Sequence, residues 1–178
     1  MIARFLMVVA FATAGQIVDL SGKLQDPFRS SAAARVFLFV RTDCPVTNRY
    51  APELQRIAAQ FSGRNVEFWL VYPDPAETPS GMETHIAEYR FPGNPLHDPR
   101  HDLVKRAQAT VAPEAAVFDT SGKLRYHGRI DDRYVAFGKS RAVARTHDLE
   151  VAISAVLAGQ PVAVPKTRAI GCALSDVK

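Results

Sequence analysis

The sequence predicts an α/β fold in which helices flank a mixed central β-sheet. Apolar runs of strand type alternate along the chain with stretches of helical periodicity. The predicted order is strand, helix, strand, two helices, β-hairpin and helix, and such alternation is typical of a sheet covered on both faces. The length of 178 residues and a hydrophobic content of 47% suit one domain with a substantial core.

The first elements surround a strand-to-helix junction. Residues 36–42 and 66–72 are apolar runs that predict buried strands. Between them, residues 45–61 repeat apolar side chains at helical spacing, and Pro52 predicts a kink in this helix. A short hairpin with a Ser-Gly turn is expected at residues 17–24.

The later elements are two helices, a hairpin and a last helix, at residues 78–89, 99–109, 115–129 and 148–158. Either Thr78 or Ser80 is expected to cap the first of these helices, and Thr146 the last. Residues 91–95, rich in Pro and Gly, predict a loop. The charge-rich segment 128–134 is either a surface loop of paired charges or a segment whose side chains lie near the Cys44 end of the sheet.

The N-terminus has the features of an export signal at residues 1–14. Arg4 precedes an apolar stretch at residues 5–12, and Ala12-Thr13-Ala14 has the pattern of a cleavage site. The stretch is too short to span a bilayer, so no membrane span is expected in the mature chain. The alternative is a hydrophobic first strand. The signal predicts an extracytoplasmic protein, periplasmic or secreted, in a compartment where disulfides persist.

The remaining chain is predicted to form one domain at residues 15–159 and an extended C-terminal tail at residues 160–178. Pro161 and Pro165 keep the tail extended. The formal charge of +4 is scattered without a basic run, which argues against nucleic-acid binding.

Cys44 is the residue that most directly suggests chemistry. It lies between an apolar run and a helix that starts with Pro45. A thiol at that position faces unpaired N–H groups and the positive end of the helix dipole, which favour the reactive thiolate. The only other cysteine of the sequence is Cys172, and neither belongs to a Cys-x-x-Cys or zinc-type spacing.

Three stretches together resemble the thioredoxin-like redoxins: residues 36–54, residues 109–119 and the hairpin at 121–124. That superfamily includes peroxiredoxin-like proteins (the alkyl hydroperoxide reductase/thiol-specific antioxidant family) and exported thioredoxin-like proteins. The resemblance covers roughly residues 16–159 and implies a thioredoxin-like fold. It also implies a thiol-dependent oxidoreductase that uses Cys44, either in thiol-disulfide exchange or as a thiol peroxidase.

The resemblance assigns further residues to the site. Pro113 matches a cis-proline beside the active cysteine, and the backbone of Ala112 would be exposed there to the extended chain of a substrate. Pro45 would complete this substrate-binding surface. The site departs from thioredoxins because Thr47 occupies the place of the second cysteine. Its hydroxyl group would donate to the thiolate but cannot form a disulfide.

The site also departs from peroxiredoxins. Arg41 stands where their threonine is expected, Phe37 where their proline is, and Pro113 approximately where their arginine is. The usual peroxide-activating residues are therefore not reproduced. Arg41 or Arg49 would have to supply the positive charge.

Cys172 is a candidate resolving cysteine on a flexible tail. It would reach Cys44 within the chain or in the partner of a homodimer. The alternative is a buried or unused thiol. The expected partners are a thiol or disulfide protein reductant, or a peroxide substrate.

No cofactor and no metal site is predicted. A second hypothesis is a non-catalytic module that binds copper or a partner thiol, with Cys44 and one of the five scattered histidines as ligands. His97 and His101 are separated by Pro99 and are not expected to share a helix face.

Overall fold

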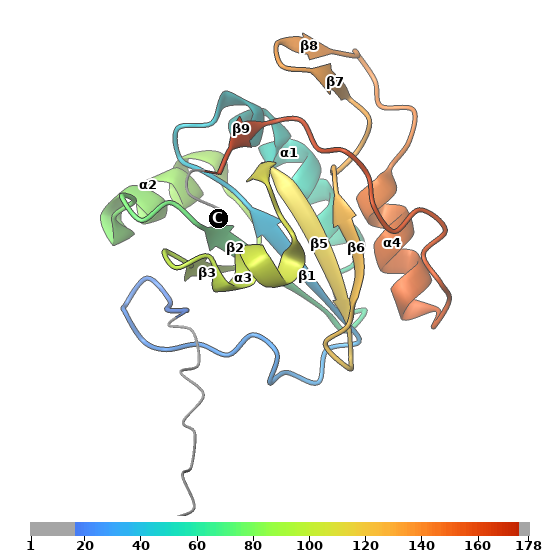
Figure 1. Ribbon diagram of the computed structural model, residues 1–178, viewed down its shortest axis with the longest axis horizontal. Helices are drawn as coiled ribbons and strands as arrows, with labels where there is room; N and C mark the ends of the chain where they lie inside the picture. Colours follow the sequence, from blue (N-terminus) through green and yellow to red (C-terminus); the bar gives the residue numbers. More distant parts are fainter. Residues whose placement is uncertain (1–16, 175–178) are drawn as a thin grey trace, which may run out of the picture.

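The computed structural model describes residues 17–174, so the predicted signal peptide at 1–14 lies outside the described chain. A five-stranded mixed sheet of order β3-β2-β1-β5-β6 forms the centre (Figure 1). Its strands are β1 Ala34–Phe39, β2 Val66–Tyr72, β3 Asn94–His97, β5 Glu114–Asp119 and β6 Leu124–Gly128. The helices are α1 Pro45–Gln60, α2 Pro79–Tyr89, α3 Asp102–Ala107 and α4 Asp148–Leu157. The predicted fold class is confirmed.

The central strand β1 shows why the sheet needs helices on both faces. It runs parallel to β2 and antiparallel to β5, and all six of its residues are buried. Its side chains alternate between the two faces. Val36 and Leu38 belong to a core shared with α1, α2 and α4, whereas Phe37 and Phe39 belong to a second core shared with α3.

The capping residues expected from the sequence can be compared with the starts of α2 and α4. Thr78 accepts a hydrogen bond from the Gly81 amide at 3.2 Å and is therefore the cap of α2. The expected cap of α4 is wrong: His147 occupies that position without a side-chain cap, and the Thr146 hydroxyl donates to the Asp148 carboxylate at 2.8 Å. Helix α1 continues through Pro52.

Short strands account for most of the remaining differences. Strand β3 begins inside the predicted loop, and it accommodates Pro95 because an edge strand leaves one side of its backbone unpaired. The expected N-terminal hairpin forms, with an antiparallel bridge between Val18 and Leu24 and a hydrogen bond of 2.9 Å from the Asp19 amide to the Lys23 carbonyl oxygen, but it is too short to form two strands. Two further strand pairs lie outside the main sheet: β7 (Tyr134–Ala136) with β8 (Lys139–Ser140), and β4 (Val111–Ala112) with β9 (Cys172–Ala173).

The charge-rich segment 128–134 is partly interior. Ile130 is buried, and Asp131 is buried with its carboxylate accepting a hydrogen bond of 2.5 Å from Tyr50 of α1. Arg129 pairs with Asp148 of α4 at 2.9 Å. The segment therefore fastens α1 and α4 to the end of β6.

Within residues 17–174, no helix has the length and apolar character that crossing a bilayer requires.

Candidate active site at the start of helix α1

Cys44 is the N-cap residue of α1 and is completely buried. Its backbone is extended, with φ −93° and ψ 109°, and no side chain caps the helix. Pro45 begins the helix, and the first turn carries no acidic residue. The N–H groups of this turn therefore have no side-chain acceptor, and the positive end of the helix dipole lies beside the sulfur. This environment favours a thiolate in the reduced protein.

The two cysteines, which are 128 residues apart, are joined as a disulfide, with their Cα atoms 6.0 Å apart. The chain after α4 crosses the top of the molecule as a long arm and brings β9 beside the start of α1 (Figure 1). Strand β9 pairs antiparallel with β4, so that Ala112 faces Cys172 and Val111 faces Ala173. The arm thus forms an added strand at the edge that borders Cys44.

The residues expected at the substrate surface adjoin the disulfide. The Ala112–Pro113 peptide bond is cis. The Ala112 carbonyl oxygen lies 3.1 Å from Cys44 Sγ. Pro45 is exposed at the helix start. The backbone that borders the sulfur is therefore that of β4, and in this state the arm occupies its free edge.

Thr47 lies one helical turn after Cys44, on the same side of α1. Its side chain is completely buried, and its Oγ1 atom has no hydrogen-bond partner. An unpartnered hydroxyl group in the interior is costly, and such a group in a native structure calls for an explanation, for example a role in another state of the protein. In the disulfide state the Thr47 hydroxyl group is a free donor one helical turn after Cys44.

Glu114 anchors the strand that faces the sulfur. It follows Pro113 directly and is buried. Its carboxylate accepts hydrogen bonds from the amides of Thr110 at 2.8 Å and Val111 at 3.3 Å. These bonds fix the loop that leads into β4. His127 lies 3.4 Å from the other carboxylate oxygen, at the base of a cavity of about 620 Å³ under the arm.

The loop before Cys44 is fixed by charged groups. The Arg41 guanidinium pairs with Asp43 at 2.9 Å and with Asp74 at 3.3 Å. The Thr42 amide donates to the Glu77 carboxylate at 2.7 Å, and burial raises the pKa of Glu77. The Asp43 carboxylate is thus engaged by Arg41, as a loop-stabilising role predicts, and its charge is partly compensated.

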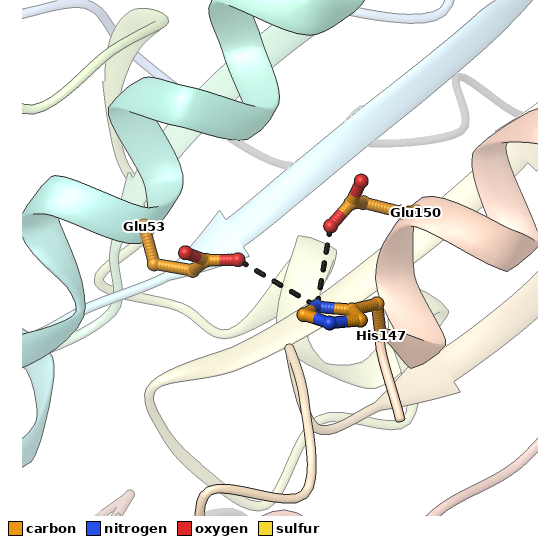
Figure 2. Close-up of side chains that lie close together, drawn as sticks. All are labelled: Glu53, His147 and Glu150. Atoms are coloured by element: carbon orange, nitrogen blue, oxygen red, sulfur yellow. Dashed lines mark ion pairs between the residues drawn. The ribbon is translucent and has the colours of Figure 1, made fainter. Parts of the chain in front are cut away.

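The structure brings one cluster of potential metal ligands together within residues 17–174, and it contains neither cysteine. Figure 2 shows Glu53 of α1 and Glu150 of α4 directed at His147. Arg56 pairs with both carboxylates, at 2.6 Å from Glu53 and closer still to Glu150. A guanidinium group already neutralises these oxygens, so the cluster is an ion-pair network between two helices. His97 lies in β3 and His101 before α3, so they share no helix face.

Several solved structures of other proteins have a fold similar to that of this chain. The solved structures it resembles include an uncharacterized conserved protein from Geobacillus kaustophilus, with a TM-score of 0.76, 24% identity and coverage of 89% of this chain and 86% of the other. A hypothetical protein from Sinorhizobium meliloti has a TM-score of 0.73 and 25% identity, over 87% and 86% of the two chains. A secreted disulfide oxidoreductase from Mycobacterium tuberculosis has a TM-score of 0.54 and 19% identity, over 79% and 92%.

These structures share the thioredoxin-like fold. A family model, that of the AhpC/TSA family, matches residues 15–127, and the chain belongs to this family. The search of curated proteins gives no match. Family membership and the disulfide confirm the predicted class, a thiol-dependent oxidoreductase of the redoxin superfamily.

Three residues that border the site were not assigned these roles from the sequence. Arg41 holds the arm, because its guanidinium donates to the Ala173 carbonyl oxygen at 3.0 Å. Glu114 holds β4, and its position directly after Pro113 was the available signal. Gly171 precedes Cys172, and a glycine beside a cysteine on an extended arm indicates a close backbone approach.

Proposed function

We propose that the protein catalyses thiol-disulfide exchange, with Cys44 as the attacking residue and Cys172 of the same chain as the resolving residue. The observation that carries this proposal is the Cys44–Cys172 disulfide at the start of α1, against the backbone of Ala112. A cysteine at a helix N-terminus is the better nucleophile of the two, because the helix stabilises its thiolate. Cys172 lies near the end of an arm that is fastened at two places: Pro165 and Thr167 bond the backbone of His127 in β6, and residues 172–173 pair with β4.

The cycle follows from this arrangement. The Cys44 thiolate attacks one sulfur of a substrate disulfide, forms a mixed disulfide and releases the first substrate thiolate. The Cys172 thiolate then attacks Cys44 Sγ, which releases the second substrate thiol and forms the Cys44–Cys172 disulfide. The substrate gains two electrons, and the protein loses two. A dithiol protein reductant restores the starting state by the same exchange in the opposite direction.

The remaining site residues have supporting roles in this proposal. Thr47 donates its free hydroxyl group to the Cys44 thiolate, which lowers the pKa of the thiol. Ala112, Pro113 and Pro45 border the sulfur and form the surface on which an extended substrate chain lies. Support for these roles comes from burial of the unpartnered Thr47 hydroxyl and from the added-strand pairing that the arm already makes with β4.

Turnover of a disulfide substrate tests the proposal. With a dithiol reductant in excess, the wild-type protein is expected to reduce a disulfide-bonded peptide catalytically, and Cys44→Ser is expected to be inactive. In a single turnover of the pre-reduced protein, with the reductant removed, Cys172→Ser is expected to complete the first half of the cycle and stop as a mixed disulfide. Unchanged turnover by Cys44→Ser would refute the proposal.

A thiol peroxidase is the second candidate, and membership of the AhpC/TSA family favours it. The residues that usually surround the reactive cysteine of a peroxiredoxin are not found at the corresponding positions of this sequence. Phe37 packs in the core, and Arg41 is bound to carboxylates and to the arm. Pro113 stands approximately where the peroxiredoxin arginine is expected. Consumption of hydrogen peroxide that depends on Cys44 and outpaces disulfide exchange would favour the peroxidase. Stoichiometric retention of Cu(I) by Cys44 without either activity would favour the binding module.

We further propose that the protein works outside the cytoplasm, with residues 1–14 removed, residues 15–159 as the redox domain and residues 160–178 as the arm. A disulfide persists readily in such a compartment. Fractionation of cells that express the full chain, with N-terminal sequencing of the product, tests this location. A product that keeps residue 1 and stays in the cytoplasm would contradict it.

A further inference from the structure

The arm residues Gly171 to Leu174 lie along β4 as if they were a bound peptide. Their backbone pairs with β4, and the Leu174 amide donates to the Thr110 carbonyl at 3.1 Å. Main-chain pairing of this kind supplies affinity, whereas the surroundings of each side chain supply specificity. The three positions around Cys172 have different surroundings, so the contacts of the arm indicate what this site selects.

The position before the cysteine has no room for a side chain. A Cβ atom built on Gly171 would lie 2.6 Å from the Ala112 carbonyl carbon and closer still to its oxygen, and 3.0 Å from Pro113 N. These are backbone atoms, which cannot rotate away. The φ angle of Gly171 is not positive, so the glycine is needed for space and not for its backbone conformation.

The residue after the cysteine is bound through its backbone carbonyl group and not through its side chain. The Ala173 side chain is exposed, and the Ala173 carbonyl oxygen accepts a hydrogen bond from Arg41 at 3.0 Å. Such a contact fixes the register of an extended chain without selecting a side chain. The arginine itself is held by Asp43 and Asp74 and is therefore preorganised for this contact.

The second position after the cysteine is apolar. Leu174 is 8% exposed and belongs to the core that contains Ala112 and Leu103. A small hollow lined by Arg41, Pro73, Asp74 and His101 borders its side chain. The polar groups of these residues are already paired, Arg41 with two carboxylates and His101 with the Pro73 carbonyl oxygen, so a neutral polar side chain in place of Leu174 would lose its hydration without a free partner.

We infer that residues 171–174 occupy the substrate subsites, and that the site selects polypeptides with the pattern glycine, cysteine, any residue, apolar residue. This inference rests on the function proposed above and names its substrate class: an extended, cysteine-containing polypeptide. Ala112 excludes side chains before the cysteine, Arg41 holds the carbonyl after it, and the hollow around Leu174 selects the apolar residue. Because the arm fills these subsites, closure of the Cys44–Cys172 disulfide also displaces the product.

The test uses the reduced full-length Cys172→Ser protein and five-residue peptides. The parent peptide copies Ile170 to Leu174, and its cysteine carries 2-nitro-5-thiobenzoate in a disulfide. The Cys44 thiolate attacks the peptide sulfur, the old disulfide breaks, and the coloured 2-nitro-5-thiobenzoate thiolate leaves with the electron pair. One S–S bond replaces another, so no external oxidant is needed, and mass spectrometry verifies the Cys44–peptide product.

Alanine in place of the glycine, and asparagine in place of the leucine, are each expected to slow the reaction roughly tenfold or more. Serine in place of the alanine after the cysteine is the matched control and is expected to leave the rate within about twofold, since that side chain is exposed. Equal rates for all four peptides would overturn the inference while leaving the proposed function intact. Failure of the protein to react with any peptide would overturn the proposed function itself.

The variant Arg41→Gln tests the backbone contact. Each peptide rate is divided by the rate with 5,5′-dithiobis(2-nitrobenzoate), a probe without a peptide backbone, so that a changed thiolate reactivity cancels. The normalised rate is expected to fall by roughly the same factor, about five- to tenfold, for all peptides. An unchanged normalised rate would overturn the role of Arg41.

Discussion

Cys172 pairs through its backbone with Ala112, the residue whose carbonyl oxygen lies 3.1 Å from Cys44 Sγ. The two sulfurs and the strand beside them therefore meet at one place, although 128 residues separate the cysteines. Under the proposed function, the C-terminal arm both carries the resolving thiol and occupies the strand edge that an extended substrate would use.

Thr47→Val is expected to stabilise the oxidised protein and, at the same time, to make the Cys44 thiol less reactive. The substitution keeps the shape but removes a buried hydroxyl group without a partner, so the oxidised protein is expected to become more stable by about 1 kcal/mol. The pKa of the Cys44 thiol in the reduced protein is expected to rise by about one unit, because the thiolate loses a donor. Denaturant unfolding and the pH dependence of thiol alkylation measure the two effects. Thr47→Ser, which keeps the hydroxyl, is the control, and an unchanged thiol pKa in Thr47→Val would refute the role of Thr47.

Gly171→Ala is expected to hinder docking of the arm. The new methyl group meets the backbone of Ala112, and relieving such overpacking costs about 1–3 kcal/mol. Since about 1.4 kcal/mol corresponds to a factor of ten, formation of the Cys44–Cys172 disulfide after reaction with a substrate is expected to slow roughly 5- to 160-fold. Rapid-quench alkylation measures this step. Ala173→Ser, at an exposed position two residues further along the arm, is expected to close at the wild-type rate; equal slowing in both variants would point to a general effect on the arm.

The fold and half of the site could be predicted from local sequence. The apolar run before Cys44 and the proline after it specify a strand that passes into a helix, and the structure has that junction. The resemblance to the redoxins, rather than the local pattern, indicated Pro113 and the second backbone segment of the site. Strand β3 was missed because its residues Asn94 and Pro95 are poor strand formers and follow Pro92 and Gly93, and only pairing with β2 makes residues 94–97 extended.

The pairing of the arm could not be predicted, because it depends on backbone contacts with β4 and with His127 of β6, which are distant in the sequence. Two cysteines so far apart in sequence carry no local signal of their proximity. The same holds for Arg41, whose contact with Ala173 arises only once the arm has folded back.

Reduction of the disulfide is expected to destabilise the protein substantially. In the chain-entropy account, a link across 128 residues stabilises the fold by about 5 kcal/mol, because it restricts the unfolded chain. Denaturant unfolding with and without a reductant measures the difference. The reductant is expected to have no effect on Cys172→Ser, which has no disulfide to lose. Equal stability of the oxidised and reduced wild-type proteins would contradict an intact native disulfide.

His85 is expected to make stability depend on pH below about 6.5. Its ring bonds Tyr72 and Asn48 at 2.8 Å each, and its burial lowers its pKa below the ordinary value of 6.5. The unfolded chain therefore binds a proton first as pH falls. The stability that neutral His85 contributes to the fold is fully present above pH 6.5 and is lost as pH falls through the pKa of His85 in the folded protein.

Comparison with His85→Gln isolates this contribution. Asp98 has the opposite effect: burial raises its pKa to about 6, so its contribution to stability is lost as pH rises through that value. Both proteins keep Asp98, and its effect cancels in the difference between their unfolding free energies. That difference is expected to be flat above pH 6.5 and to shrink below it. A difference that stays flat down to pH 5 would contradict the neutral, buried state of His85.

The most direct test of the proposed cycle is to trap the mixed disulfide. Reduced wild-type and Cys172→Ser proteins are mixed with a disulfide-bonded peptide, quenched by alkylation and mapped by mass spectrometry. The account predicts an intramolecular Cys44–Cys172 disulfide in the wild type and a stable peptide adduct on Cys44 in the variant. An adduct on Cys172 in the wild-type protein, or no adduct on Cys44 in the variant, would contradict it.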